Sequence, residues 1–269
     1  MFKQACAVLA ASSLMVLVGC GGDAPPPSKA PSGGGGATTT APKTEKKSSS
    51  KKEAPPAGAK GSVKGVVAFD GEAPKRKQID VAGDKYCASK HDADPLLTEE
   101  IVVKDGKLAN VIVYVKSGAD KWEFPTPSEA VKIDQTGCHY VPHVLAMMAG
   151  QTLDVVNSDD TTHNIHGMGK ENPEFNIGQP PAKKDTKKLE SAELPYNVGC
   201  DVHKWMNAKI GVFDHPFFAV TGEDGKFELK GLPDGDYELE AWHEKLPAQS
   251  GKVTIKDGAA VDQNFTFKK

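Results

Sequence analysis

Residues 195–206 read Pro-Tyr-Asn-Val-Gly-Cys-Asp-Val-His-Lys-Trp-Met and place three metal-binding side chains within seven positions. Cys200, His203 and Met206 are spaced three residues apart, so one tight loop can direct a thiolate, an imidazole and a thioether to a common point. A soft sulfur combined with nitrogen and a weak thioether favours copper among the biological metal ions. The stretch therefore predicts a copper-binding loop that needs one more imidazole from a strand upstream.

That imidazole is expected in residues 159–166, which read Asp-Asp-Thr-Thr-His-Asn-Ile-His after a strand-like run. Residues three apart point to opposite faces of an extended chain, so only one of His163 and His166 can face the metal. We choose His163, which lies 37 positions before Cys200 and leaves room for a connection and one returning strand. With the loop it completes a trigonal cysteine and dihistidine set with a distant methionine, as in blue-copper sites.

The pair His163-Asn164 followed by Cys-x-x-His-x-x-Met resembles the ligand pattern of type 1 copper proteins, the cupredoxins, with the loop spacing of amicyanins. The resemblance covers about residues 130–214 and implies a Greek-key β-sandwich that holds one type 1 copper and transfers single electrons. It also implies that Asn164 hydrogen-bonds across the site and braces the cysteine loop. The loop departs from the family at Val198, where an aromatic residue is usual, and lacks the usual prolines, which bears on redox potential and solvent exposure more than on copper binding.

Two alternatives to a copper site remain. Cysteine, histidine and methionine within one loop also occur as ordinary core residues, because methionine often fills gaps in a core. Zinc is the less favoured metal, since a thioether is a poor zinc ligand, but a cysteine and dihistidine zinc site stays open. His203, on the loop, is expected to form the exposed edge through which electrons leave. We expect structural or hydrogen-bonding roles for the remaining histidines of interest, which are His139, His143, His215 and His243.

Short β-rich runs dominate from residue 62 onward, and several of them alternate apolar and polar residues as half-buried strands do. Asp-Gly, a strong hairpin signal, occurs at 70–71, 105–106, 224–225, 234–235 and 257–258. No long segment keeps an apolar period of 3.6 residues without interruption by glycine, proline or Asp-Gly. The fold class is therefore expected to be all-β and antiparallel.

The stretch 218–243 resembles the small transthyretin-like sandwiches called carboxypeptidase regulatory-like domains and the related accessory β-domain of rhamnogalacturonan lyases, which has a carbohydrate-binding-like fold. Residues 62–71 resemble the first strand of such a unit. We therefore expect a cupredoxin-like copper domain at 61–215, packed with a carboxypeptidase regulatory-like module at 216–269. An alternative is that the first strand, at 62–71, is shared with the C-terminal module. No residue of this module indicates sugar binding. No nucleophile–base pair or pair of carboxylates stands out in it either, so we do not expect the protein to be an enzyme.

The N-terminus has the form of a lipoprotein signal peptide at 1–19, with a charged start, an apolar run and Leu-Val-Gly before Cys20. Cys20 is then expected to carry lipid and to anchor the protein to a membrane; an ordinary signal peptide is the alternative. Residues 20–60 contain PPP, GGGG, TTT and SSS and almost no large apolar side chains, which predicts a disordered linker. The expected location is the cell envelope, facing the periplasm or the cell exterior.

The net charge of the expected folded part indicates which kinds of binding partner it suits. Residues 1–60 hold eight of the 33 basic and three of the 36 acidic residues, which leaves 25 and 33 and a net charge of about −8 for the rest. This acidity argues against nucleic acid as a partner and suits a basic redox protein in the cell envelope.

The five cysteines can all be assigned. Cys6 lies in the expected signal peptide and Cys20 is expected to carry lipid. The economical assignment of the rest is a Cys87–Cys138 disulfide, with Cys200 left as the metal-binding thiolate.

Three functions are compatible with these features. The leading one is a membrane-anchored, exported type 1 copper protein that transfers single electrons. The second is a carbohydrate-binding or structural surface lipoprotein without a redox role, and the third is a copper carrier.

Overall fold

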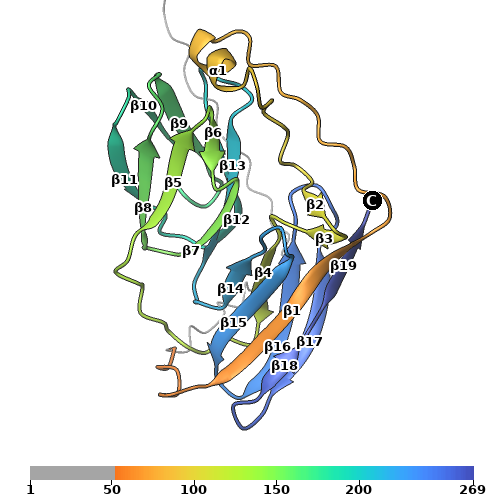
Figure 1. The fold of residues 1–269 in the computed structure, drawn as a ribbon. Helices are drawn as coiled ribbons and strands as arrows, with labels where there is room; N and C mark the ends of the chain where they lie inside the picture. Colours follow the sequence, from red (N-terminus) through yellow and green to blue (C-terminus); the bar gives the residue numbers. More distant parts are fainter. Residues whose placement is uncertain (1–51) are drawn as a thin grey trace, which may run out of the picture. The chain divides into compact units, whose positions relative to one another are not determined.

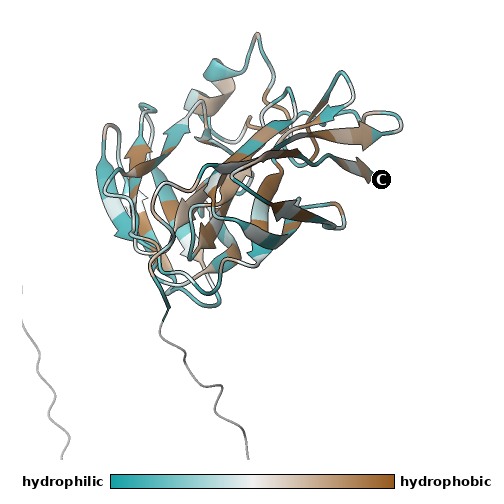
Figure 2. Cartoon of the chain, turned by 90° about the horizontal axis from the view of Figure 1, so that it is seen from below, coloured by the Kyte–Doolittle hydropathy of each residue, from teal (hydrophilic) through white to brown (hydrophobic). Residues whose placement is uncertain are grey.

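The computed structural model describes residues 52–269, which consist of β-strands and one short helix (Figure 1). This confirms the all-β prediction. The expected signal peptide at 1–19, the lipidated Cys20 and the linker up to residue 51 lie outside the described residues. None of the helices in the described part of the chain is long and apolar enough to cross a membrane. Apolar residues are concentrated in the strands, and most connecting loops are hydrophilic (Figure 2).

Nine consecutive strands form one sandwich of two sheets, with strand orders β10-β9-β12-β13-β7 and β11-β8-β5-β6. Two of its strand pairs, β5 with β8 and β7 with β13, are parallel, which departs from the purely antiparallel expectation. The two sheets enclose a core that includes Tyr140, Ile165 and Tyr196, each 0% exposed. The strands are β5 (Val131–Thr136), β6 (His139–Val141), β7 (Val144–Met148), β8 (Thr152–Asn157), β9 (His163–Met168), β10 (Phe175–Gln179), β11 (Lys184–Lys188), β12 (Glu193–Gly199) and β13 (Asn207–Phe213).

The other strands form a second sandwich around a separate apolar core. One sheet has the order β15-β1-β3-β2, with β18 and β19 also paired to β1, and the other has the order β14-β4-β16-β17. The strands are β1 (Gly61–Asp70), β2 (Val103–Lys104), β3 (Lys107–Leu108), β4 (Ile112–Ser117), β14 (Phe218–Val220), β15 (Lys226–Leu232), β16 (Gly235–Trp242), β17 (Gln249–Ile255), β18 (Ala260–Asp262) and β19 (Phe265–Lys268).

Strand pairing divides the chain differently from the expected ranges 61–215 and 216–269. Strand β1 pairs with β15, β18 and β19, and strand β4 pairs with β14 and β16, all of which follow the copper loop. Strands β2 and β3 join the same sheet through β1, so the first sandwich is inserted between β4 and β14. The physical reason is the burial pattern of β1, in which buried residues alternate with more exposed ones. Its buried Val63 and Val67 belong to the apolar core of the second sandwich. Glu53 bridges Trp122, so the expected linker ends before residue 60.

A long connection between β1 and β2 carries the only helix among residues 52–269, α1 (Lys85–Lys90). The Asp84 side chain caps its N-terminus by accepting a hydrogen bond of 2.9 Å from the Cys87 N–H. Cys87 forms a disulfide with Cys138, in the turn between β5 and β6, with Cα atoms 5.7 Å apart. The disulfide therefore fixes α1 to the first sandwich, beside a small apolar cluster that includes Val81 and Leu96.

Candidate metal centre

The predicted ligands meet at one end of the first sandwich. His163 begins β9, and residues 200–206 connect β12 to β13. Because β12 pairs with β9, with Gly199 opposite His166, the cysteine loop leaves its strand beside the start of β9. His163, Cys200, His203 and Met206 are all buried, with exposed fractions between 0% and 4%. A local loop motif and a histidine from far upstream are thus brought together by strand pairing.

Three donor atoms converge. The Nδ1 atoms of His163 and His203 lie 2.8 Å apart, and Cys200 Sγ lies 3.9 Å from His203 Nδ1. One donor atom from each of these residues lies within 4.8 Å of the others. Cys200 is the free cysteine among residues 52–269. A thiolate and two imidazole nitrogens aimed at one buried point fit a copper ion of the trigonal type.

The loop holds its shape through its own backbone. The Cys200 N–H donates to the Met206 carbonyl over 3.2 Å, and the Met206 N–H donates to the His203 carbonyl over 2.9 Å. The His203 N–H donates to Cys200 Sγ over 3.3 Å. Met206 belongs to the same apolar cluster as Cys200 and is 1% exposed, so its thioether is buried in the core of the first sandwich. The buried cluster of these three residues with His163 is consistent with a type 1 copper site.

Asn164 connects β9 to the cysteine loop. Its Oδ1 accepts hydrogen bonds from the Asp201 N–H at 2.7 Å and the Val202 N–H at 3.3 Å, and lies 3.2 Å from Cys200 Sγ. Its Nδ2 donates to Asn176 Oδ1 over 2.8 Å. These contacts give Asn164 the bracing position that the resemblance implies. Every polar atom of this amide is used, so the sulfur-bearing end of the loop is held against β9.

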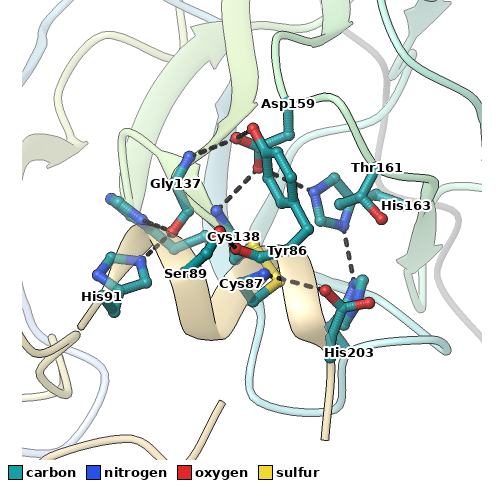
Figure 3. Close-up of a disulfide and its surroundings, with 12 residues drawn as sticks. Tyr86, Cys87, Ser89, His91, Gly137, Cys138, Asp159, Thr161, His163 and His203 are labelled. Atoms are coloured by element: carbon teal, nitrogen blue, oxygen red, sulfur yellow. Dashed lines mark hydrogen bonds and ion pairs between the residues drawn. A yellow bond between two sulfur atoms is a disulfide. The ribbon is translucent and has the colours of Figure 1, made fainter. Parts of the chain in front are cut away.

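Each of the two imidazoles has a carboxylate near its Nε2 atom. Asp159 Oδ2 accepts a 2.9 Å hydrogen bond from His163 Nε2 (Figure 3). Asp84 Oδ2 lies 3.3 Å from His203 Nε2, but that N–H is not aligned with the oxygen, so the contact is electrostatic. Sequence reasoning missed both aspartates. The available signal was the expected Cys87–Cys138 pairing, which would have brought the Asp84 segment to the first sandwich.

Electrostatics favour an ionised sulfur. Burial opposes ionisation of the Cys200 thiol, but hydrogen bonds from His163 and from neighbouring backbone N–H groups outweigh burial and lower its pKa. Burial likewise opposes the charged form of His163, yet Asp159 and Cys200 together raise its pKa to about 9. Burial would raise the pKa of Asp159, but His163 and two backbone N–H groups hold it below its ordinary value. The thiolate form of cysteine is the one that binds metals.

The prediction that His203 forms an exposed edge is wrong. His203 is only 2% exposed. The start of α1 lies on one side of its ring, and the Trp205 ring lies on another, with 5.0 Å between the ring centroids. The Trp205 indole is itself anchored, because its Nε1–H donates to the Cys138 carbonyl over 3.0 Å. The cover comes from the connection between β1 and β2, a segment outside the resemblance, so the loop sequence could not reveal it.

The other histidines lie outside the donor cluster. His166, the rejected candidate, is 20% exposed in its side chain and lies between Glu174 and Asp201. His143 Nε2 lies 2.5 Å from Glu244 Oε1, a buried contact between the two sandwiches. His215 binds the Val115 carbonyl, and His243 accepts from a backbone N–H. His139 lies 3.0 Å from the Gly137 carbonyl.

No protein-family model matches the chain, and no curated protein matches it. Among solved structures, the purple cupredoxin of Nitrosopumilus maritimus matches 30% of this chain and 97% of its own, with 22% identity and a TM-score of 0.27. A Cu(I) form of an amicyanin variant matches 31% and 81%, with 21% identity and a TM-score of 0.28. The copper-containing nitrite reductase of Thermus scotoductus matches 37% of this chain at 22% identity and a TM-score of 0.29, over only 25% of its own length.

These matches are distant, and the description of the site rests on its own geometry. Fold and site together define an all-β protein whose first sandwich holds a buried cluster of cysteine, histidine and methionine. The resemblance of the second sandwich to carboxypeptidase regulatory-like domains stays a prediction.

Proposed function

We propose that this protein is a type 1 copper protein that transfers single electrons. The observation that carries the proposal is the convergence of Cys200 Sγ with the Nδ1 atoms of His163 and His203 in a buried pocket. Copper bound there would supply a one-electron redox couple. Cys200 would donate the thiolate, the two histidines would donate nitrogen, and Met206 would be the distant fourth ligand.

The chain itself favours rapid electron exchange. Backbone hydrogen bonds within the loop and the Asn164 brace hold the cysteine loop against β9, so the donor residues would move little when the site gains an electron. Burial of all four ligands excludes water from the pocket. A site that rearranges little between oxidation states exchanges electrons with little structural cost.

A copper carrier is the less favoured function, because a carrier must release its ion readily. Here the site is closed by α1, and α1 is fixed by the buried Cys87–Cys138 disulfide. No specific contact favours a carbohydrate-binding role for the second sandwich, so we do not assign one.

In this proposal the protein works in the cell envelope, facing the periplasm or the exterior. Lipid on Cys20 would anchor it to the membrane, and residues 21–51 would form the tether. Its partner would be a redox protein with a basic surface, since residues 61–269 carry a net charge of about −8.

The test is the optical and spin-resonance spectrum of the Cu(II)-loaded protein. We expect an intense blue colour, because thiolate bonding to Cu(II) gives strong visible absorption in such sites. Cys200→Ser should abolish the colour, whereas His166→Gln, which changes the nearby histidine outside the cluster, should leave it unchanged. A colourless Cu(II) complex of the unmodified protein would rule out the type 1 assignment.

A further inference from the structure

Both histidines of the centre have a carboxylate behind the ring, on the side opposite Cys200. His163 donates from Nε2 to Asp159, whose side chain is 3% exposed. His203 Nε2 faces Asp84, whose side chain is 28% exposed. A histidine that binds metal through one nitrogen is usually held by an acceptor on the other, and a carboxylate acceptor makes the ring a stronger electron donor.

The Asp159 carboxylate is fixed on several sides. Its Oδ1 accepts from the Gly137 N–H at 2.7 Å and from the Tyr86 hydroxyl at 3.2 Å. Its Oδ2 accepts from the Cys138 N–H at 2.8 Å as well as from His163. Such a carboxylate cannot swing away from the ring, so its negative charge is a permanent feature of the pocket wall.

The disulfide ties both carboxylates to the centre. Asp84 lies three residues before Cys87 and caps the start of α1. Asp159 accepts a hydrogen bond from the Cys138 N–H (Figure 3). Donor atoms of Asp84, Cys87 and His203 lie within 4.8 Å of one another, as do those of Cys138, Asp159 and His163. One covalent link therefore holds two charged residues against two imidazoles.

We propose that Asp159 and Asp84 are positioning residues of the copper centre: Asp159 fixes the His163 ring through its hydrogen bond, and both carboxylates favour the oxidised state of the centre. The inference rests on the proposed function, since it concerns copper as the occupant. When the centre gains one electron, Cu(II) becomes Cu(I) and the site loses one positive charge. Two nearby negative charges stabilise the more positive Cu(II) form, so they lower the reduction potential.

Asp159 has the larger effect and Asp84 the smaller. Asp159 is more deeply buried, and its hydrogen bond of 2.9 Å is shorter than the 3.3 Å contact of Asp84. Water reaches Asp84 and screens its charge. The two effects should differ in size and agree in sign.

The experiment compares Asp159→Asn and Asp84→Asn by copper affinity and reduction potential. Asparagine caps a helix about as well as aspartate, so Asp84→Asn keeps α1 and removes only the charge. The matched controls are Asp160→Asn and Asp92→Asn, which remove exposed charges from the same two segments. We expect both test variants to stay blue and to have raised potentials, and Asp159→Asn to bind Cu(II) roughly 10- to 100-fold more weakly.

A further variant separates charge from structure. Tyr86→Phe removes one hydrogen bond to Asp159 and keeps both carboxylates, so its potential should stay closer to that of the unmodified protein than the potential of Asp159→Asn does. If Asp159→Asn does not fold, Asp84→Asn decides. Blue, folded variants with the potentials and affinities of their controls would overturn this inference alone. Unmodified protein without a type 1 spectrum would instead overturn the proposed function.

Discussion

The Cys87–Cys138 disulfide closes a loop across both sandwiches, and its removal should be costly. The two cysteines are 51 positions apart, and both are 0% exposed. In the chain-entropy model, a cross-link over a loop of that length restricts the unfolded chain by about 4 kcal/mol at 25 °C. Since domains are typically stable by about 5–15 kcal/mol, the double change Cys87→Ala/Cys138→Ala should remove a large share of the stability.

Urea unfolding of the metal-free protein measures the effect. The double variant should unfold about 4 kcal/mol more easily, and reductant should have no effect on it. Unmodified protein unfolded in reductant should approach the variant, because its unfolded chain then loses the same cross-link. This comparison separates the loop effect from the loss of two buried sulfur atoms, which only the variant suffers.

A local effect should accompany the global one. Residues 71–100 contain one short helix and most of a small apolar cluster, so without the disulfide only side-chain hydrogen bonds, such as that of Tyr86 to Asp159, and a few apolar contacts hold them over His203. Amide hydrogen exchange in α1 should become much faster in the double variant than in β9. A loss of less than about 1 kcal/mol in urea, together with unchanged exchange in α1, would refute the role given to the disulfide.

Two further predictions concern buried polar groups. The Tyr140 hydroxyl is fully buried and lies 2.6 Å from the Asn164 carbonyl oxygen and 2.9 Å from the Gly199 carbonyl oxygen. Tyr140→Phe should therefore lower the free energy of unfolding, measured in urea, by about 1–3 kcal/mol. A change near zero would mean that these carbonyls find other hydrogen-bond partners. Burial lowers the pKa of His243 to about 4. Between pH 6.5 and 4 the unfolded chain therefore binds more protons than the folded one. The contribution of neutral His243 to the free energy of unfolding should be fully present above pH 6.5 and decrease as the pH falls from 6.5 to 4. His243→Asn should show a smaller loss over the same window, by up to about 3 kcal/mol, and equal pH profiles would contradict the assignment.

Much of the centre was predictable because its information is local. The spacing of Cys200, His203 and Met206 places the three side chains within the reach of one short loop. The alternation of side chains along an extended chain predicted that only one of His163 and His166 faces the metal, and His163 was chosen. In the structure His163 is fully buried beside Cys200, while His166 is partly exposed and lies between two carboxylates.

The sequence by itself determined the all-β class and the three candidate donors of the loop, since strand alternation and donor spacing depend on neighbouring residues. Only the tertiary structure decided that β1 to β4 complete the C-terminal sandwich, that α1 covers His203, and that Asp84 and Asp159 stand behind the imidazoles. These features join residues dozens of positions apart. Such contacts form because packing and a disulfide repay the entropy of closing long loops, and no local pattern records which loops will close.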